Sequence, residues 1–87
     1  MTVAPAAADA VEVVALRPYV LRIVLDDGRT GTFDVGPYLD FPAFAALRDP
    51  GYFARVGIEN GVVAWPGSED LAPETVVARL RDGEGGA

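Results

Sequence analysis

The segment 19–35 alternates apolar and polar positions, and the rest of the chain is arranged around it. In its first half every second residue is large and apolar, namely Tyr19, Leu21, Ile23 and Leu25. Because successive side chains of a strand point to opposite faces, this spacing predicts a strand with one buried face. The alternation resumes after residues 26–28, at Phe33 and Val35, so the segment is predicted to be a β-hairpin.

The loop of this hairpin is predicted from the residues that it brings face to face. A two-residue loop at 27–28 would put Phe33 on the face of Arg22, which splits the apolar set between two faces. A three-residue loop at 26–28 instead sets Leu21 opposite Phe33. We therefore predict a type I turn followed by a bulge, with Gly28 at positive φ, where a residue without Cβ avoids a clash.

Two further segments have the pattern of strands. Residues 11–16, with the sequence VEVVAL, are predicted to pair antiparallel with the central hairpin. Residues 56–65 are predicted to form a second hairpin around Asn60-Gly61, a strong two-residue turn signal because both central residues need positive φ. This turn places Ile58 opposite Val63, and residues 66–70 after the hairpin are predicted to form a loop.

Three short segments have helical spacing or helix-start signals. A helix is expected over about 42–48, with Asp40 as a candidate cap. Asp49 is a candidate N-cap for a single turn within 50–55, where Pro50 occupies the first position. A C-terminal helix is predicted over 73–81, because Pro opens it and its acidic and basic ends complement the helix dipole.

These elements together predict an α+β fold. Its antiparallel sheet contains the two hairpins plus the first strand, and short helices, including the C-terminal one, cover it. A chain of 87 residues makes one domain. We expect a flexible N-terminal arm over 1–10, a single domain over 11–82 and a flexible tail over 83–87.

Composition excludes several kinds of chemistry. The formal charge is −6, from 13 acids and 7 bases, and every base is Arg. This balance disfavours nucleic acid and anionic membranes as partners. There is no Cys and no His, so thiolate nucleophiles, disulfides and His-based triads or zinc sites are excluded. We therefore predict no catalytic residues, no cofactor and no metal site, and a cytoplasmic protein without a secretory signal.

Two acidic pairs are candidate sites. Asp26-Asp27 lacks the ligand pattern of a calcium loop, so we interpret it as part of the turn. Trp65, Glu69 and Asp70 are the candidate contacts for a ligand or partner, because an aromatic residue near two carboxylates could hold a small ligand or serve a carboxylate-based enzyme. A lone Trp closing a strand is more often a core anchor, and adjacent acids rarely flank a substrate.

The outer face of the predicted hairpin is the other candidate contact surface. Arg22, Thr32 and Asp34 would share this face with Val20, Val24 and Thr30, which makes it less polar than a solvated face usually is. The primary hypothesis is a non-enzymatic protein-interaction or regulatory accessory module. A homodimer formed through this face or through an open sheet edge is a further hypothesis.

The order of several motifs resembles a known family. The series VLRIVLDDGRTGTFDVGPYL, followed by FAALRDPGYFARVGIENGVVAWPGSEDLAPETV, is similar to the small bacterial DUF2442 domains of unknown function over about residues 11–80. The chain departs from that pattern at Ser68-Glu69, where an Asn-Gly commonly stands. The resemblance implies an α+β fold with an antiparallel sheet and no established catalytic residues. It also implies an antitoxin-like role, because the genes of some longer relatives resemble the neighbours found in toxin–antitoxin pairs.

Overall fold

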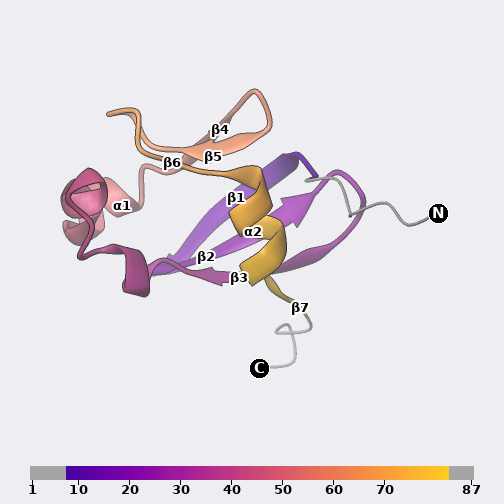
Figure 1. Cartoon of the computed structure of the whole chain (residues 1–87), viewed down its shortest axis with the longest axis horizontal. Coiled ribbons are helices and arrows are strands. Elements are labelled where there is room, and N and C mark those ends of the chain that lie inside the picture. The colour runs from indigo at the N-terminus through magenta and orange to yellow at the C-terminus, as the bar shows by residue number, and fades with distance from the viewer. Residues whose placement is uncertain (1–7, 83–87) are drawn as a thin grey trace.

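The computed structural model describes residues 8–82 and confirms the α+β class (Figure 1). The elements in chain order are β1 (Ala10–Arg17), β2 (Val20–Leu25), β3 (Thr30–Asp34), the 3-10 helices η1 (Gly36–Tyr38) and η2 (Pro42–Arg48), α1 (Pro50–Phe53), β4 (Gly57–Glu59), β5 (Val62–Ala64), β6 (Asp70–Leu71), α2 (Pro73–Arg79) and β7 (Arg81–Asp82). The first strand begins at Ala10, which is buried. Residues 1–7 of the predicted arm and the predicted tail 83–87 lie outside the described residues.

The larger sheet has the strand order β1-β2-β3-β7, with antiparallel pairing throughout. The predicted register of its hairpin is confirmed, because Leu21 pairs with Phe33 and Arg22 pairs with Thr32. Gly28 has a φ of 94°, as the predicted loop requires. The facing argument therefore identified both the turn and the buried face.

The smaller sheet contains the second hairpin and has the order β4-β5-β6. Ile58 pairs with Val63 as predicted, and Asn60 and Gly61 have φ values of 52° and 80°. The expected strands are thus divided between two sheets. The prediction of a plain loop over 66–70 is wrong at its end, because Asp70 pairs with Ala64 and starts the short strand β6.

The helices agree with the predicted positions better than with the predicted types and caps. The segment 42–48 is a 3-10 helix whose N-cap is Phe41, so the prediction that Asp40 caps it is wrong. Asp49 does cap α1, since its side chain accepts a hydrogen bond from the Gly51 N–H at 3.0 Å. The C-terminal helix ends at Arg79 rather than at 81, because the chain turns extended at Leu80 and joins the edge of β3.

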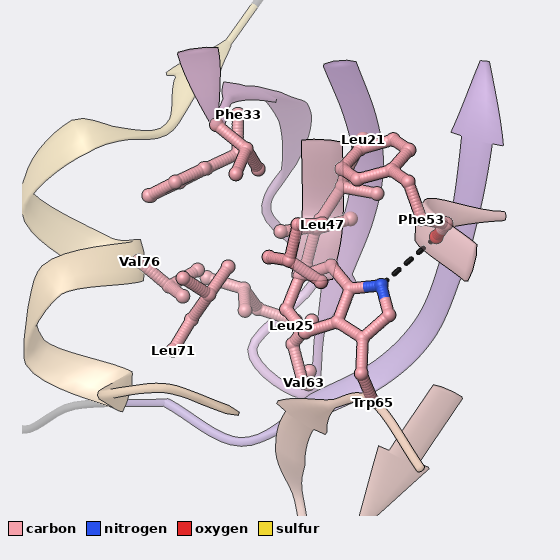
Figure 2. Packing of buried hydrophobic residues seen from close by; sticks show 12 residues of the cluster. Leu21, Leu25, Phe33, Leu47, Phe53, Val63, Trp65, Leu71 and Val76 are labelled. Carbon is pink, nitrogen blue, oxygen red and sulfur yellow. Dashed lines mark hydrogen bonds between the residues drawn. The ribbon is translucent and has the colours of Figure 1, made fainter. Parts of the chain in front are cut away.

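The core lies between one face of the larger sheet and a covering set made of η2, α1, the smaller sheet and α2 (Figure 2). Leu21, Ile23 and Phe33 have exposed fractions of 0%, which confirms the predicted inner face. The elements that cover this face contribute Leu47, Phe53, Val63, Trp65, Leu71 and Val76. In Figure 1, α2 lies across β2 and β3 while the smaller sheet lies beside β1. All these elements cover the same face of the larger sheet.

Within residues 8–82 no helix combines the length and the apolar character that crossing a membrane requires. The longest helices, η2 and α2, have 7 residues each.

Candidate functional site

Trp65 is part of the core. Only 4% of the residue is exposed, and its indole Nε1–H donates to the carbonyl oxygen of Phe53 at 2.9 Å (Figure 2). The ring of Phe53 lies against it, with 5.9 Å between centroids. A buried indole N–H needs such a partner, because an unsatisfied polar group is costly away from water. Trp65 thereby ties the second hairpin to α1.

Glu69 is engaged in holding the loop before β6. Its Oε1 accepts a hydrogen bond from the Tyr52 hydroxyl at 2.7 Å, and the same hydroxyl oxygen accepts from the Gly67 N–H at 2.7 Å. The bond to the Glu69 carboxylate, assisted by partial burial, raises the pKa of Tyr52 above its ordinary value. Asp70 is exposed in β6, opposite Ala64.

The three predicted contact residues do not line one common hollow. Trp65 lines a hollow of about 260 Å³ together with Arg55 and Glu59. Glu69 and Asp70 line a separate hollow of about 220 Å³. The structure brings the two acids together and leaves the indole elsewhere.

The acidic pair at the first turn is local in its contacts. The Asp27 carboxylate forms an ion pair with Arg29 at 2.7 Å and accepts from the Arg29 backbone N–H at 3.0 Å. These bonds lower the pKa of Asp27. Among residues 8–82 no group of three or more potential metal-ligating acids, cysteines or histidines gathers in one place.

The outer face of the larger sheet is built from rows of paired residues, and two neighbouring rows contain its arginines. In an antiparallel pair, residues opposite each other point to the same face, so the register defines each row. The first row contains Val14, Arg22, Thr32 and Arg81, and the second contains Arg17, Val20 and Asp34. Their neighbours along β2 and β3 form the inner face, where Leu21 and Phe33 are fully buried.

The first strand gives this face an apolar border. Val11, Val14 and Leu16 of β1 have exposed fractions of 57%, 43% and 44%. The register of β1 with β2 shifts between Ala10 and Glu12 and again between Ala15 and Arg17, so Val11 and Leu16 are the extra residues of two bulges. Phe41, at 52%, is the other exposed large apolar residue of the described chain.

Arginine side chains surround a shallow hollow beside this border. A hollow of about 260 Å³ on the outer face is lined by Arg17, Val20, Thr32, Asp34 and Arg81. A second hollow, of about 190 Å³, adjoins it and shares Asp34 and Arg81 while adding Arg79 and Tyr38. One oxygen of Asp34, Oδ1, accepts from the Gly36 N–H at 2.8 Å. Arg22 does not line either hollow, but it pairs with Thr32 on the same face. We call Arg17, Arg22, Arg79 and Arg81 the arginine cluster.

Sequence reasoning found part of this surface and missed the rest. It placed Arg22, Thr32 and Asp34 on one outer face, as the register shows. It missed Arg81, because residues up to 81 were assigned to the C-terminal helix whereas Arg81 pairs with Thr32 in β7. The one signal available was the short alternation of Leu80 with Arg81, which is too brief to distinguish a strand from a helix end.

Comparison with protein families shows which family the chain matches. The model described as "Protein of unknown function (DUF2442)" matches residues 10–82. No curated protein and no solved structure matches the chain.

Proposed function

Given that the chain belongs to the DUF2442 family, whose function is unknown, we propose that it is a non-enzymatic protein-interaction module. Its contact surface is the outer face of the larger sheet together with β1. The implied antitoxin-like role is one form of such a module, in which the partner is a protein that this chain restrains.

The observation that carries the proposal is the concentration of exposed apolar side chains on β1. Val11, Val14 and Leu16 are the exposed large apolar residues of the larger sheet in the described chain. Burying a side chain of this size contributes about 1.5–3 kcal/mol, so several of them in one patch favour an interface. Val20 and Val24 extend the patch across β2, where both are half-buried.

The face, rather than the edge of β1, is the main contact surface in this proposal. An exposed edge strand can accept a further strand through its unpaired backbone groups. Here the bulges at Val11 and Leu16 interrupt the regular edge and leave only the stretch between them. Bulges of this kind protect edges from pairing with other chains.

The alternative function, ligand binding or carboxylate chemistry near Trp65, receives less support. The indole N–H of Trp65 is bonded to a backbone carbonyl, and the Glu69 carboxylate is bonded to Tyr52. These groups serve the packing of the smaller sheet against α1. A ligand at this place would have to compete with bonds that hold the fold.

Site-specific photo-crosslinking in the native cell tests the proposal. A photoreactive amino acid replaces Val14 in one variant and Phe41 in the other, since both positions are exposed and apolar. We expect a discrete protein adduct from position 14 and none from position 41. The captured protein, once purified, should bind the unmodified chain in a defined stoichiometry.

Two substitutions then test whether the captured protein contacts β1. Val14→Asp is expected to weaken the purified complex strongly, because it buries a charge in the interface, whereas Phe41→Asp should leave the affinity unchanged. Isothermal titration calorimetry measures both. An affinity that is insensitive to Val14→Asp and is lost with Phe41→Asp would contradict the proposed surface.

A further inference from the structure

We propose that the arginine cluster is a subsite for carboxylates, and that the partner segment seated there is an extended, acidic stretch of polypeptide. This inference rests on the proposed function and adds the chemistry of the partner to it. Val14 of the apolar border on β1 lies in the same outer-face row as Arg22 and Arg81 of the cluster, so one partner segment can contact both.

The register sets the spacing of the cluster. Arg22 and Arg81 flank Thr32 in one row, so they lie two strands, or about 10 Å, apart. Arg17 belongs to the next row, and neighbouring rows on one face are separated by about 7 Å. In an extended peptide, every second side chain points to the same side with this same spacing of about 7 Å. Alternating acids would therefore meet successive rows.

Among the residues whose side chains the structure describes, the guanidinium groups of the cluster have no bonded partner. Arg29 is paired with Asp27 and Arg48 with Asp40, but none of the four cluster arginines makes a side-chain hydrogen bond or ion pair with another described residue. Each guanidinium carries five N–H donors in a planar fork that fits a carboxylate. The one acid lining both hollows, Asp34, already accepts the Gly36 N–H with Oδ1.

The charge of the whole chain makes this local excess of positive charge unusual. The chain has a formal charge of −6, yet three of its 7 bases, Arg17, Arg79 and Arg81, line the hollows beside Asp34, and Arg22 lies on the same sheet face. The other acid on this face is Glu12 of β1, opposite Val24. A long polyanion such as nucleic acid would be repelled by the net negative charge of the chain. A short acidic segment would be close mainly to the arginine cluster, which attracts it. Charge complementarity thus favours an acidic peptide.

Nuclear magnetic resonance titration of the full chain tests the subsite. The probe is a short peptide, blocked at both ends, in which Glu alternates with Thr. We expect its addition to shift the amide signals of Val20, Arg22 and Thr32 in a salt-dependent way. The same peptide with Gln in place of Glu should cause no shifts there.

Arginine variants separate local recognition from net charge. Arg22→Gln and Arg81→Gln are each expected to raise the dissociation constant of the Glu peptide about tenfold, since charge-assisted hydrogen bonds are lost. Arg55→Gln removes the same charge from another hollow and should have no effect. Unchanged amide signals in the rest of each variant verify its fold. Arg81 is on an edge strand, so Arg81→Gln alone serves if Arg22→Gln unfolds.

Three results would overturn the subsite: no amide shifts with millimolar Glu peptide, equal weakening by Arg55→Gln, or tighter binding of a single-stranded oligonucleotide of equal charge at the same residues. Failure of the peptide would leave the proposed function standing if the crosslink from position 14 still forms. Failure of that crosslink, with the peptide still bound, would instead remove the proposed surface for protein partners and leave a carboxylate site.

Discussion

The two faces of the larger sheet differ in burial and in side-chain type, although neighbouring residues of the same strands form them. On the inner face Leu21, Ile23 and Phe33 have no exposed surface, and they belong to one core cluster with residues of the smaller sheet and the helices. On the outer face Val14 keeps 43% of its surface exposed, and the face around it carries arginines, threonines, valines and the acids Glu12 and Asp34. The backbone is common to both faces, so the difference lies in the side chains and in what covers them.

This contrast separates the face that holds the fold together from the face that, in the proposed function, contacts a partner. The inner face is committed to the core and can change little without loss of stability. The outer face contributes little to the core, so its apolar and charged side chains are free to serve another purpose. Substitutions on the two faces should therefore have effects of very different size.

The largest difference is expected between Phe33 and Val14. Phe33→Ala should lower the free energy of unfolding by about 3–5 kcal/mol, because it removes a fully buried ring and leaves a cavity. Val14→Ala, on the outer face, should cost less than about 1 kcal/mol. Urea denaturation measures both, and Phe33→Leu replaces the first variant if it does not fold. Equal losses of unfolding free energy at the two positions would contradict the difference between the two faces.

A second test uses adjacent residues of β3. A Cβ at Gly31 would lie 2.5 Å from the backbone oxygen of Arg81 and 2.9 Å from Cγ of Leu80. Gly31→Ala should therefore push β7 away and cost about 1–3 kcal/mol. Thr32→Ala, one position along on the outer face, should change the free energy of unfolding by less than about 1 kcal/mol. Thermal melting of the two variants makes the comparison.

If Gly31→Ala does detach β7, the arginine cluster should lose Arg81 as a member. The affinity for the Glu peptide would then fall in Gly31→Ala although the substituted residue is on the inner face. Retention of β7 pairing, seen as unchanged amide exchange at Arg81, would contradict the close approach that requires glycine here.

The smallest effect is expected from a bond that holds the covering layer. The pKa of Tyr52 is raised above its ordinary value of 10.0, chiefly by the hydrogen bond to Glu69. A raised pKa in the folded state means that this contribution to stability is complete below pH 10 and is lost as the pH rises through the folded pKa. The stability difference between the natural chain and Tyr52→Phe should therefore shrink above pH 10. A difference that stays constant from pH 8 to 11 would contradict this.

The predictable part of the fold comprised the features that short-range physics decides. The alternation from Tyr19 to Leu25 predicted the inner face, the facing of Leu21 and Phe33 predicted the turn at Gly28, and the Asn60-Gly61 pair predicted the second turn. The two-residue strands β6 and β7 were not predictable, because their pairing depends on which sheet edge the chain meets.

The same limit applied to the candidate site. The predicted strand register placed Arg22 and Asp34 on one surface. The nearness of Arg17, Arg79 and Arg81 could not be predicted, because it follows from long-range strand pairing and from the end of α2. Trp65, Glu69 and Asp70 are close in sequence, and this led to the expectation of one site. The strand β5 directs the indole into the core, where Phe53 accepts its N–H, while the two acids line another hollow.

The most direct test of the central claim is hydrogen–deuterium exchange of the chain, alone and bound to the protein captured from position 14. If the outer face is the contact surface, deuterium uptake should fall in peptides covering β1 and β3, residues 10–17 and 30–34. Uptake over the smaller sheet, residues 57–71, should not change. Protection confined to 57–71, with β1 and β3 unchanged, would contradict the account.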